Sequence, residues 1–141
     1  MKLEKVLYRG KASATGGRQG KAVSSDGILN VTLTTPKEMG GDGAPGTNPE
    51  QMFAAGYSAC FLGAMKAVAR GEKITLPDNA HIDGTVGFGP IPGGYGIEVE
   101  LQITVPGMER KTVETLVEKA HKVCPYSNAT RGNVEVSLKV M

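Results

Sequence analysis

The feature that most constrains the fold is a long apolar segment in the middle of the 141-residue chain. Residues 51–65 carry no charged side chain, and apolar residues fall on nearly every side of the helix that they would form. Lys66 ends this segment below the length needed to cross a bilayer, so we expect a buried helix and no membrane partner. A domain of this size has little room to bury such a helix alone, which predicts a homodimer.

The start of this helix is well marked in the sequence. Asn48 is a good N-cap, Pro49 suits the first helical position, and Glu50 favours the positive end of the helix dipole. The helix is expected to end at Arg70, because Gly71 follows it.

Two glycines lie inside the predicted helix, at positions 56 and 63. Each costs about 1 kcal/mol relative to alanine in a helix interior. We therefore expect something, most simply another backbone, to pack very close to the helix at these positions.

The rest of the chain predicts strands and one more helix. The expected elements are a three-stranded meander in residues 1–35, a loop at 36–48, a hairpin of 79–88 and 95–105, a helix from about 109 to 124, and a strand at 134–140. The order βββ-α-ββ-α-β predicts an α+β fold. We expect a single domain of residues 1–141, with antiparallel sheets around the central apolar helix, in an intertwined homodimer.

Composition excludes some partners and indicates a compartment. The net charge is only +2 and the Lys and Arg residues are scattered, which argues against a nucleic-acid partner. The N-terminal segment has no apolar stretch typical of a secretory signal, so we expect a cytoplasmic protein. In the cytosol a pair of cysteines is more often catalytic, redox-sensing or metal-binding than a permanent disulfide.

The two cysteines, Cys60 and Cys124, each have an unremarkable interpretation as small buried apolar residues. A zinc site would need two more ligands, for which His81 and His121 are available. The loose spacing and the absence of a CxxC half-site argue against it, so no metal is expected.

A functional interpretation treats the cysteines as a peroxide-attacking and a resolving thiol. Cys124 precedes Pro125 at the end of a helix, where the dipole disfavours a thiolate, and this suits a resolving thiol. Cys60 lies in an apolar helix, and desolvation would raise its pKa, so it needs a nearby cation. Arg18, in a Gly-rich turn, is the best candidate.

Arg18 would have to do more than form a thiolate. Lowering a thiol pKa from about 8.5 to about 6 gains roughly 30-fold in thiolate at pH 7, but reduced nucleophilicity removes on the order of tenfold. Arg18 should therefore also stabilise charge that develops across the O–O bond.

Glu50 could fix Arg18 by a bidentate ion pair, or could simply favour the helix dipole. Glu50 and Cys60 are ten residues apart in the sequence, about 15 Å along one helix. For a Glu50–Arg18 pair to act beside Cys60, the long arginine side chain must therefore span this distance, or the pair must be supplied across a dimer interface.

The residues singled out above lie within segments that resemble the organic hydroperoxide resistance protein family, in the superfamily that includes osmotically inducible protein C (OsmC/Ohr). The matching segments are residues 16–18, 25–27, 47–51, 54–61 and 123–133, and the last is typical of the hydroperoxide resistance branch. Together they extend over nearly the whole chain.

The resemblance implies a thiol peroxidase that reduces organic hydroperoxides to alcohols. It implies that Cys60 attacks the hydroperoxide, that Cys124 resolves the sulfenic acid as an intramolecular disulfide, and that Arg18 and Glu50 poise Cys60. It also implies two active sites at the interface of an obligate homodimer. The implied reductant is an external lipoyl dithiol, such as a lipoylated protein, and no bound cofactor is expected.

Apolar residues near the predicted site could favour alkyl or fatty-acyl peroxides; they are Met52, Phe53, Phe61 and Tyr126. Three alternatives stay open at this point. The first is the osmotically inducible branch of the superfamily, the second an inert binding or scaffold protein, and the third a redox sensor.

Overall fold

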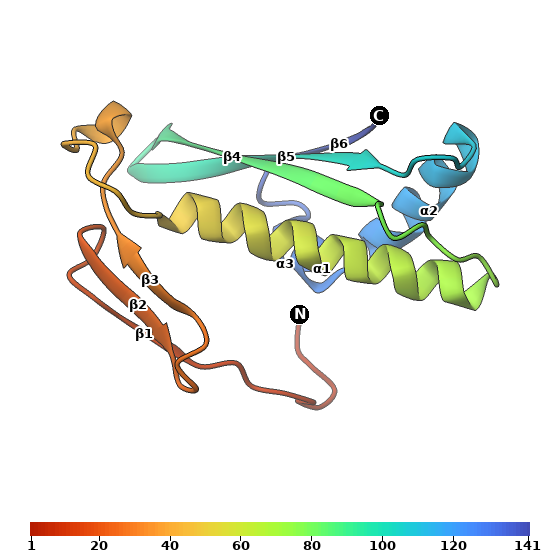
Figure 1. Ribbon diagram of the computed structural model, residues 1–141, viewed down its shortest axis with the longest axis horizontal. Coiled ribbons are helices and arrows are strands. Elements are labelled where there is room, and N and C mark those ends of the chain that lie inside the picture. The colour runs from red at the N-terminus through yellow and green to blue at the C-terminus, as the bar shows by residue number, and fades with distance from the viewer. The chain divides into compact units, whose positions relative to one another are not determined.

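The computed structural model describes the whole chain, Met1–Met141, which forms two compact units (Figure 1). The first unit is Met1–Pro49 and the second is Glu50–Met141. Each contains one three-stranded sheet, so the predicted α+β class is confirmed.

The first unit is the predicted meander. Strands β1 (Ala12–Thr15), β2 (Gly20–Ser24) and β3 (Asn30–Leu33) pair antiparallel in the order β1-β2-β3. The segment expected to be a loop contains one 3₁₀ turn, η1 (Lys37–Met39), which ends where Gly40 adopts a left-handed conformation with a φ of 92°.

The second unit holds the remaining elements. They are α1 (Pro49–Gly71), β4 (His81–Ile91), β5 (Gly94–Thr104), α2 (Arg110–Val123), α3 (Pro125–Thr130) and β6 (Val136–Val140). All the elements expected here are present within a few residues of their predicted bounds. The short helix α3 was not expected.

The expectation that both sheets are antiparallel is wrong for the second sheet. Its order is β4-β5-β6, with β4 antiparallel to β5 but β6 parallel to β5. A parallel pair needs a long crossover connection, and α2 and α3 provide it between β5 and β6. Alternation in the sequence predicts a strand but not its direction.

Helix α1 runs along one face of the second sheet, and the core of the unit lies between them (Figure 1). Tyr57, Phe61 and Met65 on the helix are fully buried, as are Leu101 and Ile103 on β5. These large apolar side chains alternate along β5 and recur at four-residue spacing along α1, so each element presents one continuous apolar face to the other.

A glycine on β4 allows the helix to approach the sheet closely. A Cβ atom added to Gly84 would lie 2.5 Å from the Ser58 Oγ atom and 3.1 Å from the carbonyl oxygen of Ala54 on α1. The buried Ser58 hydroxyl has no hydrogen-bond partner. The close packing at this crossing therefore leaves one polar group unsatisfied.

Helix α1 is less completely covered than its composition predicts. Its length and composition alone would let it cross a membrane, but its largest side chains pack on the sheet, as in a core helix. A stripe of small residues on α1 is nevertheless exposed; they are Ala55, Ala59, Gly63 and Ala67. Nothing else in the chain lies within 4 Å of a Cβ added to Gly63, so no neighbour within one chain explains that glycine.

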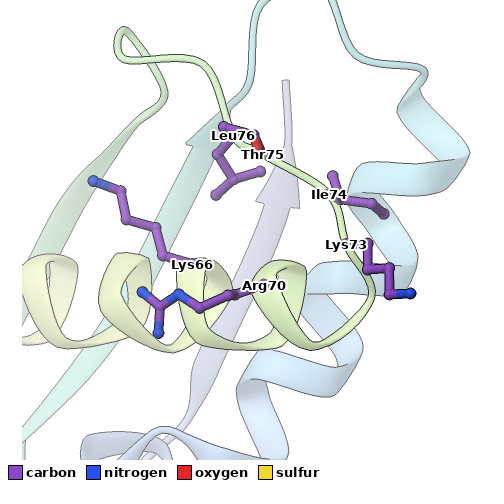
Figure 2. A pocket seen from close by; sticks show the side chains of 6 residues that line it. All are labelled: Lys66, Arg70, Lys73, Ile74, Thr75 and Leu76. Carbon is purple, nitrogen blue, oxygen red and sulfur yellow. The ribbon is translucent and has the colours of Figure 1, made fainter.

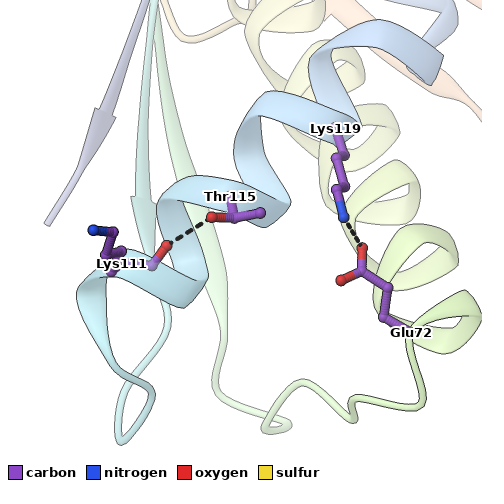
Figure 3. A network of polar contacts seen from close by, with 4 residues as sticks. All are labelled: Glu72, Lys111, Thr115 and Lys119. Atoms are coloured by element: carbon purple, nitrogen blue, oxygen red, sulfur yellow. Dashed lines mark hydrogen bonds and ion pairs between the residues drawn. The ribbon is translucent and has the colours of Figure 1, made fainter.

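Helix α2 is held to the C-terminal end of α1 by an ion pair at the surface (Figure 3). The Lys119 Nζ atom lies 2.7 Å from the Glu72 Oε2 atom, and Thr115 donates a hydrogen bond to the Lys111 carbonyl oxygen within α2. Such exposed pairs are worth about 1 kcal/mol or less. The position of α2 is thus set mainly by its buried side chains, which are Val113, Leu116, Val117 and Ala120.

Candidate functional site

The two cysteines, which are 64 residues apart in the sequence, come together in the second unit. The Sγ atoms of Cys60 and Cys124 lie 3.7 Å apart, and both cysteines are free thiols. A disulfide needs a separation of about 2.05 Å, so a small movement would join them. The intramolecular disulfide that the resemblance implies requires such closeness, while the chemical roles of the two cysteines remain predictions.

The junction between α2 and α3 places Cys124. Its backbone N–H donates to the Ala120 carbonyl oxygen and ends α2, while its own carbonyl oxygen accepts from the Asn128 N–H and begins α3. Cys124 has extended backbone angles, as the residue before a proline must, and Pro125 is the first residue of α3. The chain therefore turns sharply at Cys124, whose side chain is fully buried.

The surroundings of Cys60 favour the neutral thiol. Burial raises the pKa of Cys60, and the adjacent Cys124 raises it further. A hydrogen bond from the Tyr126 backbone acts in the opposite direction and lowers this pKa. The prediction that desolvation raises the pKa of Cys60 is thus confirmed, while the role of a nearby cation remains a prediction.

Aromatic rings surround this part of α1. Tyr126 lies with its ring centroid 5.6 Å from that of Tyr57 and 6.0 Å from that of Phe53. A Cβ added to Gly56 would lie 3.0 Å from the Tyr126 hydroxyl oxygen. The expectation that something packs very close to the helix is therefore confirmed at Gly56, but the neighbour is a side chain from α3 and not a backbone.

Arg18 and Glu50 lie in different units. Arg18 is half-buried in the turn between β1 and β2, where Gly16 and Gly17 both have positive φ angles, of 75° and 61°. Glu50 is half-buried in the first turn of α1, on the same helix as Cys60. The association of Arg18 and Glu50 with Cys60 remains a prediction.

A pocket of about 390 Å³ lies at the C-terminal end of α1 (Figure 2). Its lining residues are Lys66, Arg70, Lys73, Ile74, Thr75 and Leu76. Lys66 is six residues beyond Cys60, about 9 Å along the helix, and neither cysteine lines the pocket. The pocket is therefore separate from the sulfur pair.

No group of three or more His, Cys, Asp or Glu side chains is placed to hold a metal ion. His121, considered above as a zinc ligand, lies with its Nδ1 atom 2.8 Å from the Ser127 Oγ atom. Burial lowers the pKa of His121, and the positive charge of Arg131 adds to this effect, so the imidazole is neutral at pH 7.

The sequence model of the OsmC-like protein family matches residues 40–139 of the chain, which include both cysteines. The chain belongs to the OsmC-like protein family. This finding confirms the resemblance that the sequence motifs indicated.

The chain is similar in sequence and in structure to several organic hydroperoxide resistance proteins. An organic hydroperoxide resistance protein from Xanthomonas axonopodis pv. citri is 64% identical over 135 residues, which cover 96% of this chain and 95% of that protein. The crystal structure of an organic hydroperoxide resistance protein from Legionella pneumophila is 46% identical, with a TM-score of 0.90, and the match covers 96% of this chain and 98% of that one. The organic hydroperoxide resistance protein OhrB of Bacillus subtilis is 41% identical, with a TM-score of 0.87, over 96% of this chain and all of that one.

The contribution of α3 to the candidate site is not apparent from the sequence expectations. Pro125 marks the end of one helix there, although proline is also favoured at the first position of another. That signal could have predicted the helix α3, although not its contact with Cys60. The buried contacts of Ser127 left no comparable signal in the sequence.

Proposed function

We propose that the protein is a thiol-dependent peroxidase that reduces organic hydroperoxides to alcohols and so protects against oxidative stress. The observation that carries this proposal is the contact between two free cysteine sulfur atoms, 3.7 Å apart, in a chain closely similar to organic hydroperoxide resistance proteins. An inert pair of core cysteines would not need this contact, and Cys60 is only half-buried.

In the first step the Cys60 thiolate attacks the distal oxygen of the hydroperoxide. The S–O bond forms, the O–O bond breaks, and the alkoxide takes up a proton and leaves as the alcohol. Cys60 is thereby oxidised by two electrons to the sulfenic acid.

In the second step Cys124 attacks the sulfur of the Cys60 sulfenic acid. The S–S bond forms, the S–O bond breaks, and the oxygen leaves as water after taking up the Cys124 proton. An external dithiol then reduces the disulfide by thiol–disulfide exchange and is itself oxidised. We propose a lipoyl dithiol, free or on a lipoylated protein, for this role.

Arg18 is proposed to supply the positive charge that the buried Cys60 lacks, and Glu50 to orient the arginine. Burial raises the pKa of Cys60, so the thiolate needs a cation to form near neutral pH. The guanidinium also stabilises the charge that develops as the O–O bond breaks. A carboxylate that pairs with the arginine through two hydrogen bonds would fix this geometry.

The active form is proposed to be a cytoplasmic homodimer. The exposed stripe of small residues on α1 supports a partner on that face, because an apolar helix face left in water is unfavourable. A second chain would also provide an alternative source of the Arg18 and Glu50 groups at each cysteine pair.

We propose that aromatic side chains near the two cysteines favour hydroperoxides that carry an alkyl chain. Phe53 and Tyr126 are partly exposed and lie next to each other, so they can contact an alkyl chain. Phe61 is fully buried, and in this chain it contributes to the core and not to a substrate surface. A long-chain hydroperoxide should therefore react faster than hydrogen peroxide, and equal rates would contradict this preference.

A thiol count tests the function. One equivalent of cumene hydroperoxide added to the reduced protein should remove both free thiols, and Cys60→Ser should abolish the loss. If both thiols survive, the cysteines are inert and the proposal fails. Multiple turnovers with dihydrolipoamide distinguish an enzyme from a redox sensor, which would stop after one oxidation.

The Cys124→Ser variant tests the division of roles. Its Cys60 should still react with the first equivalent of peroxide but should proceed to the sulfinic acid when peroxide is in excess. Intact-mass measurement gives both products directly. If this variant does not react with peroxide at all, the assigned roles of the two cysteines are wrong.

A further inference from the structure

A buried hydroxyl next to the cysteine pair joins three helices. Ser127, on α3, is fully buried. Its Oγ atom lies 2.8 Å from the Tyr57 hydroxyl oxygen on α1 and 2.8 Å from the His121 Nδ1 atom on α2. The serine is therefore fixed on two sides by groups from the helices that carry, or lead into, the two cysteines.

The segment that Ser127 fixes carries two groups directed at Cys60. Cys124 places its sulfur atom 3.7 Å from that of Cys60. Two residues later, the Tyr126 backbone forms the hydrogen bond that stabilises the Cys60 thiolate. Ser127 follows at once, so both groups lie within the three residues before it.

The chain bends at Cys124, three residues before Ser127. Cys124 has extended backbone angles between two helices, and α3 is a helix of only six residues. So short a helix is not stable by itself and takes its position from tertiary contacts. The Ser127 hydroxyl is the side-chain contact nearest to the bend that reaches both neighbouring helices.

We propose that Ser127 is a positioning residue for the peroxidase reaction. Its hydroxyl, held by Tyr57 and His121, keeps the Cys124–Ser127 segment on α1 so that the resolving sulfur and the Tyr126 backbone group stay directed at Cys60. The inference rests on the proposed function for its kinetic part, while its effect on the Cys60 thiolate can be measured without any peroxide.

The structure offers a matched control at the other end of α3. Thr130 is also buried, its Oγ1 atom lies 3.2 Å from the same Tyr57 hydroxyl, and it bonds to the Ser127 carbonyl oxygen at 3.2 Å. Thr130→Val removes a buried hydroxyl from the same network but leaves both contacts of the Ser127 hydroxyl in place. A purely structural role for the network predicts the same behaviour for Ser127→Ala and Thr130→Val.

The first measurement is the pH profile of iodoacetamide alkylation in a Cys124→Ser background, where Cys60 is the only thiol. We expect Ser127→Ala to move the midpoint of this profile to higher pH, because the Tyr126 hydrogen bond is loosened. Thr130→Val should leave the midpoint unchanged. An unchanged midpoint in Ser127→Ala, or equal shifts in both variants, would overturn the proposal.

The second measurement is the rate of disulfide formation after one equivalent of cumene hydroperoxide. A displacement of about 1 Å in a reacting pair can slow a reaction by about 100-fold, so Ser127→Ala should slow this step by about 10- to 100-fold, and Thr130→Val by less than about twofold. Equal rates in the two variants would contradict the positioning role. If the unaltered protein forms no disulfide, the proposed function fails, and the alkylation profile still decides the positioning of Ser127.

Tyr57→Phe provides a second route if Ser127→Ala does not fold. It removes one of the two contacts of Ser127 and keeps the one to His121. The alkylation midpoint and the disulfide rate should change in the same directions as in Ser127→Ala, but by less. A Tyr57→Phe protein with the melting temperature lowered and both cysteine measurements unchanged would show that the network is structural only.

Discussion

The two three-stranded sheets of this protein differ in how much apolar surface they bury. In the first unit only Ala22 and Leu33 are buried apolar residues. In the second unit β5 alone buries Val99, Leu101 and Ile103 beneath an apolar helix. A sheet of three strands is stabilised by a covered apolar face, so the second unit has a substantial core of its own and the first unit has little of one.

The two units also differ in which candidate site residues they contain. Both cysteines lie in the well-packed unit, where burial holds Cys60 as a neutral thiol. Arg18, the predicted source of positive charge, lies in the unit with little core of its own. The sulfur pair therefore lies in the unit with the larger core, whereas the proposed activating charge lies in the unit that buries little apolar surface.

The largest expected effect is on the stability of the second unit. Leu101→Ala should lower the free energy of unfolding by about 2–5 kcal/mol, because Leu101 is fully buried on β5. Leu7→Ala is the matched control in the first unit, where the leucine is 86% exposed, and it should change stability by about 0.5 kcal/mol or less. Urea denaturation measures both, and similar losses would show that the first unit is covered in solution.

The next largest effect should be on the rate of the peroxide step. Arg18→Ala is expected to slow oxidation of Cys60 by about 100-fold with little change in melting temperature, because a charge that stabilises the transition state is lost. Arg9→Ala, which removes the same charge from an exposed position, is the control. A large drop in melting temperature with an unchanged rate would make Arg18 a structural residue.

A smaller effect concerns the pH at which Cys60 becomes reactive. Burial raises its pKa, so the thiolate fraction and the alkylation rate should rise with pH. Both proteins compared carry Cys124→Ser, so that only Cys60 is labelled. In the one that also carries Arg18→Ala, the pH of half-maximal alkylation should lie above the ordinary thiol pKa of about 8.5, and in the one that keeps Arg18 it should lie lower. Identical pH profiles in the two proteins would show that Arg18 does not stabilise the Cys60 thiolate.

The smallest expected effect is a gain in stability at the crossing of α1 and β4. Ser58→Ala removes a buried hydroxyl that has no partner and improves helix propensity, so it should raise stability by about 0.5–1 kcal/mol. Thermal unfolding measures the change. A loss of stability would mean that the hydroxyl has a partner in solution, for example a water molecule.

Much of the fold could be predicted because its elements have strong local signals. The capping residues before α1, the Gly-rich turns of the meander and the alternation along β5 each depend on a few neighbouring residues. The parallel direction of β6 could not be predicted in this way, because it depends on how a crossover of two helices returns the chain to the sheet.

In the candidate site, too, the features with a local signal could be predicted and the tertiary contacts could not. The two cysteines could be selected from their residue type, and desolvation of Cys60 could be argued from its apolar helix. The Tyr126 hydrogen bond and the space that Gly56 leaves for the Tyr126 ring could not, because α3 meets α1 only in the folded chain. Contacts between distant residues have no periodicity in the sequence.

The contact between the two sulfur atoms has a consequence for damage during turnover. A sulfenic acid on Cys60 can react either with Cys124 or with a second peroxide molecule, and the second reaction is irreversible in most proteins. Groups held in contact react as if at concentrations far above any that a dissolved peroxide reaches. Because Cys124 already lies 3.7 Å away before oxidation, the protective reaction of the proposed peroxidase needs only a small movement, and a burst of peroxide should exhaust the supply of reductant before it inactivates the protein.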